Sequence, residues 1–368
     1  MGPGSEVLAC FGASADPVPL PGGQGTAWRS GDVVLKPAGD LRVARWTADL
    51  YRDLDSLGPL SPLDHLDPLP ARRDPGFRVP RPLSTVAGDG AAGDWVAQDP
   101  AAGAWVAWQW LPGEPASWAG VSPFWPPLIA ASRAFHAALA GRPAPPWLGR
   151  DGSQWRVGDQ VAWGERDPGS ILAAAPGSLA GQLRSLLAAL RPVRLPAQLI
   201  HGDLGGNVLF AAGEPPAVID FSPYWRPAGL ALAVAAVDAL TWSGADPAIL
   251  DELAGEPELD QLLARAHVCR LVTEIVSQRG DPAGLDTVAR TGQPVTSLIL
   301  CRLALWPDSP APGMGNPRRR CMSAPVMTLD SMREQRDGRK RRNLAQLAHQ
   351  GGNHGASLRR HRPGHRRG

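Results

Sequence analysis

A short stretch of the chain, residues 199–221, concentrates polar side chains whose types and spacing suit phosphate chemistry. It reads LIHGDLGGNVLFAAGEPPAVIDF and contains His201, Asp203, Asn207 and Asp220. An amide oxygen and a carboxylate oxygen can share one hard divalent cation, and magnesium is normally held by one or two protein oxygens together with substrate phosphates. The stretch therefore indicates a phosphate-handling site in which Asn207 and Asp220 hold Mg2+ and Asp203 stands beside the metal as a base.

A predicted β-hairpin positions these residues. Two short apolar runs, 208–210 and 217–219, flank the turn-rich residues between them, which is the pattern of two strands joined by a turn. If the hairpin folds symmetrically about Gly213 and Glu214, Asn207 lies opposite Asp220. Directly opposed residues of an antiparallel pair have Cβ atoms about 4.5 to 5.5 Å apart, so this register would bring the two metal ligands together.

The same residues carry a family resemblance. The HGD motif at 201–203 with Asn207, followed by VIDF at 218–221, resembles the catalytic loop and metal-binding aspartate of aminoglycoside phosphotransferase and choline kinase relatives, which share the protein-kinase-like fold. The longer strings HGDLGGNVLF and IDFSPYWRP most resemble an actinobacterial subgroup of that superfamily.

The resemblance implies a role for each residue. Asp203 would be the catalytic base, Asn207 and Asp220 the magnesium ligands, and His201 a residue that orders the loop. ATP would be the phosphate donor, and the acceptor would be a hydroxyl group of an unidentified small molecule.

The catalytic loop is one residue shorter than the family pattern. Three residues, 204–206, separate Asp203 from Asn207, where the family has four. Gly205 and Gly206 could absorb the shortening because glycine adopts backbone angles that other residues avoid. The shorter loop also favours an alternative, a catalytically weak or inactive nucleotide-binding protein that acts as a sensor or scaffold. Transfer of a nucleotidyl group onto a protein is a third reading.

Lysine is so rare that each one is informative. Lys36 and Lys340 are the only lysines, whereas the other 35 of the 37 Lys and Arg residues are arginines. Lys36 ends a β-branched run at 32–36. A compact ammonium suits a point-charge contact to phosphate oxygens. The resemblance implies that a strand lysine here grips the α and β phosphates, while the plainer reading is an exposed lysine.

Two other segments complete the predicted nucleotide site. A glycine-rich turn with Gly22, Gly23 and Gly25 precedes the Lys36 strand; its backbone could lie against phosphates, or it is an ordinary flexible turn. The segment 105–115 resembles the hinge between kinase lobes, where the backbone of Gln109 to Leu111, including Trp110, would bind adenine. The alternative for that segment is a tryptophan-rich edge strand that only packs.

The acidic partner of Lys36 is left open. The family pairs this lysine with a glutamate on a helix, and the predicted helix at 41–54 has none. Asp40 and Asp49 are candidates, although Asp49 lies within helical pairing distance of Arg45 and Arg52. Farther along, Asp238 sits in an apolar helix predicted at 228–242, where it would either bond to the catalytic loop or lie on the helix surface.

The composition limits where the protein can be located in the cell and what it can bind. Hydrophobic residues make up 43% of 368 residues, and no apolar run reaches the roughly 18 residues that span a bilayer. Because the N-terminus lacks a basic segment followed by an apolar one, we expect a cytoplasmic protein with no membrane partner. The four widely spaced cysteines predict reduced thiols without a metal. Asp159, Glu165 and Asp167 either attract a cationic acceptor or are solvated.

These observations predict an α+β, two-lobed protein-kinase-like fold. Residues 1–108 would form a small antiparallel β lobe with one helix and a proline-rich insertion at 57–75, and residues 109–305 a larger, mainly helical lobe, with ATP between the two. Residues 306–368 form a basic tail, with 14 basic and 3 acidic residues from position 317 on. Such a tail is expected to be disordered; it either binds nucleic acid or is an out-of-frame extension.

Overall fold

The computed structural model describes residues 2–21, 25–57, 76–86, 93–99 and 103–304. The described residues divide into two compact units, one with residues up to Ala44 and Leu83–Trp110, the other with Arg45–Pro82 and residues 111–304. Gly22 and Gly23, residues 58–75 of the predicted insertion and the predicted tail at 306–368 lie outside the described residues.

The first unit is an antiparallel sheet with a short helix. The order of its strands is β1-β2-β3-β6-β4, and β5 also pairs with β6. The elements are α1 (Ser5–Cys10), β1 (Val18–Pro19), β2 (Trp28–Ser30), β3 (Val33–Pro37), β4 (Pro82–Leu83), β5 (Val96–Asp99) and β6 (Gly103–Gln109). The strand expected for Lys36 is therefore confirmed.

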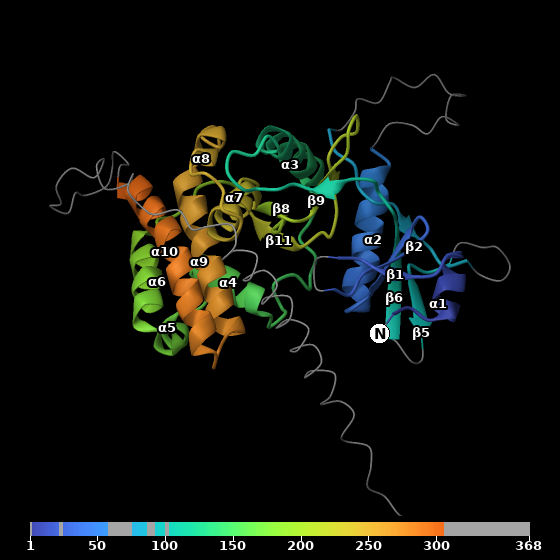
Figure 1. Ribbon diagram of the computed structural model, residues 1–368, viewed down its shortest axis with the longest axis horizontal. Helices are drawn as coiled ribbons and strands as arrows, with labels where there is room; N and C mark the ends of the chain where they lie inside the picture. The colour runs from blue at the N-terminus through green and yellow to red at the C-terminus, as the bar shows by residue number, and fades with distance from the viewer. Residues whose placement is uncertain (1, 22–24, 58–75, 87–92, 100–102, 305–368) are drawn as a thin grey trace, which may run out of the picture. The chain divides into compact units, whose positions relative to one another are not determined.

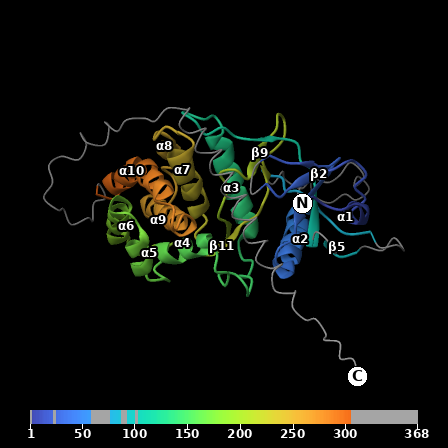
Figure 2. The same cartoon turned by 60° about the horizontal axis from the view of Figure 1, so that its bottom comes forward.

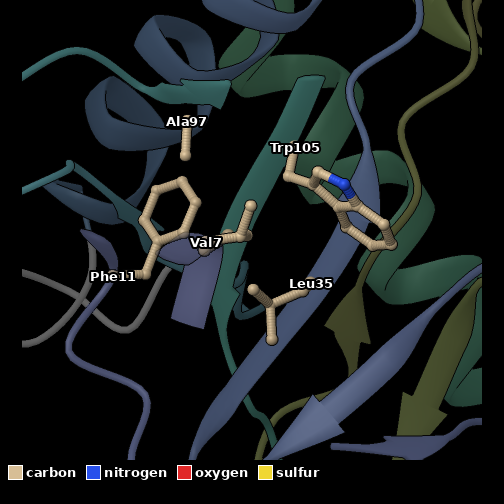
Figure 3. Packing of buried hydrophobic residues seen from close by; sticks show 6 residues of the cluster. Val7, Phe11, Leu35, Ala97 and Trp105 are labelled. Carbon is tan, nitrogen blue, oxygen red and sulfur yellow. The ribbon is translucent and has the colours of Figure 1, made fainter. Parts of the chain in front are cut away.

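The two faces of this sheet carry separate cores. On one face Leu35 and Trp105 pack with Val7 and Phe11 of the α1 segment and with Ala97, as Figure 3 shows. Successive side chains of a strand point to opposite faces, so Lys36 lies on the other one. There its cross-strand neighbour Val106 belongs to a second cluster that includes Ala44 near the start of α2 (Leu41–Asp55).

The second unit is mainly helical. In Figures 1 and 2, α9 runs among α4, α6, α7 and α10, and these contacts form the body of the unit. The helices are α3 (Trp125–Leu139), α4 (Gln154–Ala162), α5 (Gly169–Ala174), α6 (Gly177–Ala189), α7 (Leu230–Trp242), α8 (Ile249–Glu252), α9 (Leu259–Ser277) and α10 (Pro282–Ala304). None of the described helices is both long and apolar enough to cross a membrane.

One helix begins in a stretch of sequence that has no clear helical periodicity. Residues 141–157 lack a clear periodic pattern, yet α4 begins at Gln154. The side chain of Ser153 accepts a hydrogen bond from the N–H of Arg156 and thereby caps the first turn. Arg156 and Asp159 of this helix are buried, because both form ion pairs within the unit.

Candidate active site

Two pairs of short strands, one inside the other, place the predicted catalytic residues. The inner pair is β9 (Val208–Phe210) with β10 (Ala217–Val218), the predicted hairpin. The outer pair is β8 (Gln198–His201) with β11 (Pro223–Arg226). The chain passes from outer to inner pair through residues 202–207 and returns through 219–222. Asp203 and Asn207 lie on the first connection and Asp220 on the second.

The register of the inner pair differs by one residue from the predicted one. Val208 pairs with Val218, and the N–H of Ile219 donates to the carbonyl of Asn207 at 2.9 Å. Asn207 is therefore level with Ile219, and the prediction that it lies opposite Asp220 is wrong. The hairpin is centred on Gly213 itself, whose φ of 77° is favourable for glycine, instead of on the bond from Gly213 to Glu214.

The backbone leaves the strand conformation at Asp220. In a continuous strand, residues one position apart would project from opposite faces. Asp220 lies just beyond β10 and has a φ of 54°, in the left-handed region that few residues other than glycine enter. Such backbone costs about 1–3 kcal/mol and tends to occur at functional sites. The exposed Asp220 side chain thus leaves the regular alternation of the strand.

Asp203 and Asn207 are in direct contact. The side-chain Nδ2 of Asn207 donates to the backbone carbonyl of Asp203 at 2.7 Å and lies 3.3 Å from its Oδ2. These bonds fix the amide with its nitrogen toward Asp203, which leaves the amide oxygen as the end that can ligate a cation. About half of the Asp203 side chain, 47%, is exposed to solvent.

His201 orders the loop through hydrogen bonds from its buried ring. Its ring is fully buried, its Nδ1 accepts from the N–H of Asp203 at 3.1 Å, and its Nε2 donates to the carbonyl of Ile219 at 3.0 Å. The imidazole therefore bridges the two connections. Burial lowers the pKa of His201, so the ring is neutral and keeps one donor and one acceptor.

A second histidine supports the first. The backbone N–H of His201 donates to Nε2 of His136 at 3.1 Å, and Nδ1 of His136 donates to the carbonyl of Ser132 at 2.7 Å. Burial lowers the pKa of His136 to about 4. No local sequence signal identifies His136 as a partner of the HGD motif.

The glycines of the loop act differently from the prediction. Neither Gly205 nor Gly206 has a positive φ, so the shortened loop does not use the special backbone freedom expected of them. The carbonyl of Gly205 accepts from the indole N–H of Trp118 at 2.6 Å, and Leu204 is buried. Gly202 has a steric role instead, because a Cβ there would overlap the ring of Tyr224.

An arginine that sequence reasoning missed joins Asp203 to Asp238. Nη2 of Arg270, on α9, donates to Oδ1 of Asp203 at 2.9 Å, and Nε and Nη2 donate to the two oxygens of Asp238 at 2.8 and 2.6 Å. Asp238 therefore reaches the catalytic loop through Arg270. No local sequence signal could identify this arginine, since it lies 67 residues from Asp203.

The acidic residues considered for a cationic acceptor have other partners. Asp159 is buried and forms two bonds to Arg226, at 2.9 and 2.8 Å, and Glu165 pairs with the same guanidinium at 2.7 Å. Asp167 accepts from the N–H of Gly169 at the start of α5. Asp159 is therefore part of a buried ion pair, whereas the Glu165 side chain is 49% exposed and covers the outer side of the same guanidinium.

The predicted nucleotide-binding residues lie mostly in the first unit. Lys36 is on β3 and Gln109 on β6, level with Val33. Gly25 has a φ of 70° and precedes β2. The division into units falls between Trp110 and Leu111. Of the two candidate partners of Lys36, Asp40 bonds to Arg42, which lowers the pKa of Asp40 to about 2, and Asp49 lies 3.1 Å from Arg52.

The donor set at the two connections suits magnesium. Asn207 and Asp220 offer one amide and one carboxylate oxygen, hard ligands of the kind that Mg2+ takes alongside substrate phosphates. Among the described residues no three His, Cys, Asp or Glu side chains gather into a metal site. The bonds that turn the Asn207 amide oxygen away from Asp203 fit this assignment, which stays a proposal.

The chain is similar to known phosphotransferases in sequence and in fold. Residues 62–224 match the model of the phosphotransferase enzyme family, whereas no curated protein matches the chain. Among solved structures, a thermostable mutant of aminoglycoside phosphotransferase APH(4)-Ia in ternary complex with ADP and hygromycin B is 14% identical, with a TM-score of 0.50 over 81% of this chain and 97% of that one.

Two further solved structures are similar at lower scores. Spectinomycin phosphotransferase APH(9)-Ia in complex with ADP and spectinomycin has 14% identity and a TM-score of 0.45, covering 78% of this chain and 95% of that one. A choline/ethanolamine kinase family protein from Mesorhizobium loti has 17% identity and a TM-score of 0.44, covering 81% and 90%. The actinobacterial subgroup stays a prediction. The chain therefore has the two-lobed α+β fold of the aminoglycoside phosphotransferases, and the segment with Asp203, Asn207 and Asp220 matches the phosphotransferase enzyme family.

Proposed function

We propose that this protein is an ATP-dependent phosphotransferase that moves the γ-phosphate of ATP to a hydroxyl group of a small molecule. The observation that carries the proposal is the contact between Asp203 and Asn207, on a connection that faces the one with Asp220. A carboxylate for the acceptor and two oxygen ligands for a cation are the parts that phosphoryl transfer needs from this side of the site.

Each residue then has one task. Asp203 accepts the proton of the acceptor hydroxyl and orients its oxygen toward the γ-phosphate. Asn207 and Asp220 hold Mg2+, which when bound neutralises charge on the phosphates. Lys36 contacts the phosphates, with the turn at Gly22, Gly23 and Gly25. Catalysis of this kind depends mainly on positioning and charge stabilisation.

One further backbone segment completes the proposed nucleotide site. The backbone of Gln109, Trp110 and Leu111 binds the adenine ring. The carbonyl of Asp32 accepts from the N–H of Trp110 at 2.7 Å, and the guanidinium of Arg29 lies 4.0 Å from the centre of the Trp110 ring. These contacts hold the end of β6 in an extended form, which suits edge-on hydrogen bonding to a base.

The acceptor is proposed by class alone. Hygromycin B and spectinomycin are bound in the structures of similar fold, and both have hydroxyl groups. In this chain Asp159 and Glu165 are paired with Arg226 and do not supply free negative charge for a polycation. The acceptor screen therefore begins with neutral polyols and amino alcohols as well as aminoglycosides.

Turnover of ATP by the purified full chain tests the proposal. We expect Mg2+-dependent release of ADP in the absence of an acceptor, and faster release with one member of a hydroxyl-compound library. Thermal shift with ATP and Mg2+ reports binding separately. ATP binding without turnover, with or without the library, would contradict phosphotransfer and support the sensor or scaffold reading.

A further inference from the structure

The carboxylate of Asp203 is held from two sides. Arg270 contacts Oδ1 at 2.9 Å, and Asn207 contacts Oδ2 at 3.3 Å. Each carboxylate oxygen has two lone pairs, so both keep capacity on the exposed side, where an acceptor hydroxyl would bind. A carboxylate fixed at both oxygens loses its freedom to rotate about the Cβ–Cγ bond.

Arg270 is itself fixed by Asp238. The guanidinium donates through Nε and Nη2 to the two oxygens of Asp238, a bidentate geometry that sets its plane. The same Nη2 has a second hydrogen, which points to Asp203. Asp238 projects from α7 and Arg270 from α9, two helices packed against each other, so the position of the clamp is set by the helical body of the second unit.

The side chains of Arg270 and Asp238 are largely buried, which restricts their movement. The Arg270 side chain is 11% exposed and that of Asp238 is 22% exposed, against 47% for Asp203. Burial lowers the pKa of Arg270, but the carboxylates of Asp238 and Asp203 more than offset this and raise it well above its usual value. Arg270 is therefore charged throughout the pH range in which the protein is folded.

We propose that Arg270, oriented by Asp238, is a positioning residue that holds the Asp203 carboxylate in the orientation required for phosphoryl transfer. The inference rests on the proposed function and adds to it an element that the catalytic loop does not contain. The bidentate pair with Asp238 already neutralises Arg270, so the third bond to Asp203 is not needed to bury the arginine. That bond connects the helical body to the one carboxylate that meets the acceptor.

Conservative variants of the full chain test this role. Arg270→Lys keeps the charge but loses the planar fork, and Asp238→Asn leaves Arg270 in place with a weaker partner. The readout is Mg2+-dependent ADP release from ATP, analysed as kcat and KM, with affinity for a fluorescent ATP analogue measured separately. Arg302→Lys is the matched control. Arg302, on α10, bonds at 2.6 Å to Asp260, which lies on α9 as Arg270 does, and it has no contact with Asp203.

The proposal predicts a split between kcat and KM. Arg270→Lys should lower kcat about 100-fold, the scale expected for a misplacement of about 1 Å, while KM for ATP and analogue affinity stay within about twofold. Asp238→Asn should lower kcat in the same direction, and the double variant should be no slower than Arg270→Lys, because the two act as one unit. Arg302→Lys should keep the wild-type kcat.

Three results would overturn the inference, and they are distinguishable. If the wild type turns over ATP and Arg270→Lys matches it in kcat, the positioning role is wrong and the proposed function stands. If the wild type binds the ATP analogue but shows no Mg2+-dependent turnover, the proposed function fails and the positioning role fails with it. Loss of turnover together with loss of analogue binding in Arg270→Lys would mean a structural role and would also contradict the proposal.

Discussion

Nε2 of His136 accepts a hydrogen bond from the backbone N–H of His201 at 3.1 Å, which connects α3 to the first residue of the HGD motif. The ring of His201 in turn bridges Asp203 and Ile219. Two neutral, buried imidazoles thus form a continuous chain of hydrogen bonds from Ser132 to both connections of the site. The shape of the predicted catalytic loop depends on these hydrogen bonds.

Removal of the His136 acceptor should destabilise the protein. In His136→Leu the buried N–H of His201 has no partner on α3, and an unsatisfied buried donor costs about 1–3 kcal/mol. Urea unfolding of the full chain measures the change. His136→Gln, whose side-chain oxygen can accept, should lose less; equal stability of wild type and His136→Leu would show that the bond contributes nothing.

Buried histidines should also make the protein sensitive to acid. Burial lowers the pKa of His136 and of His267 to about 4, against about 6.5 in the unfolded chain. Because the folded pKa is the lower one, the unfolded state gains protons first as pH falls. Each histidine therefore gives stability that is full above about pH 6.5 and lost toward pH 4, roughly 3 kcal/mol apiece.

The His267→Gln variant isolates one of these contributions. Its free energy of unfolding, from urea titrations between pH 7 and pH 4, should fall less steeply than that of the wild type, by about 1.4 kcal/mol per pH unit below pH 6. His267 lies on α9, where its Nε2 donates to Thr296 of α10 at 2.8 Å. Parallel curves for the two proteins would contradict the assignment.

Replacement by alanine should lower the stability of the protein at one glycine of the loop and leave it nearly unchanged at another. A Cβ at Gly202 would overlap the Tyr224 ring, whereas a Cβ at Gly206 meets nothing within 4 Å. Neither glycine has a positive φ, so the comparison measures space alone. Gly202→Ala should cost about 1–3 kcal/mol of stability, and Gly206→Ala should stay within about 0.5 kcal/mol. Equal thermal midpoints for the two variants would rule out this explanation.

The buried pair of Asp159 and Arg226 should be important for stability. The side chains are 4% and 14% exposed, and removal of one partner from a buried pair typically costs about 3–5 kcal/mol. Asp159→Ala should therefore unfold at a much lower urea concentration. Asp286→Ala is the matched control, since Asp286 and Arg290 are 65% and 68% exposed and such pairs contribute little. Similar losses in the two variants would contradict the distinction.

Local signals in the sequence predicted a large part of the fold. The apolar helix predicted at 228–242 is α7, and the turn-rich residues around Gly213 predicted the inner hairpin. The α+β class and the kinase-like fold followed from the resemblance of the HGD and VIDF motifs. The helix and the hairpin depend on contacts between residues close together in the chain.

The parts that could not be predicted depend on distant contacts. β11 reads PYWR, without the alternation of a strand; it forms because β8 supplies a partner and Arg156 packs on the ring of Tyr224 at 4.4 Å. The one-residue error in register arose because composition locates a turn but not its central residue. Arg270 was missed because its role is defined only by the packing of α9 beside α7.

The most direct test of the account is the turnover of Asp203→Ala beside the wild type, with Mg2+ and radiolabelled ATP. Asp203 is half exposed, and its backbone bonds to His201 and Asn207 do not involve the carboxylate, so the variant should fold and keep its affinity for an ATP analogue. We predict that phosphate release falls by about 100-fold or more, the scale of general-base catalysis. Wild-type turnover in a folded Asp203→Ala protein would contradict the central claim.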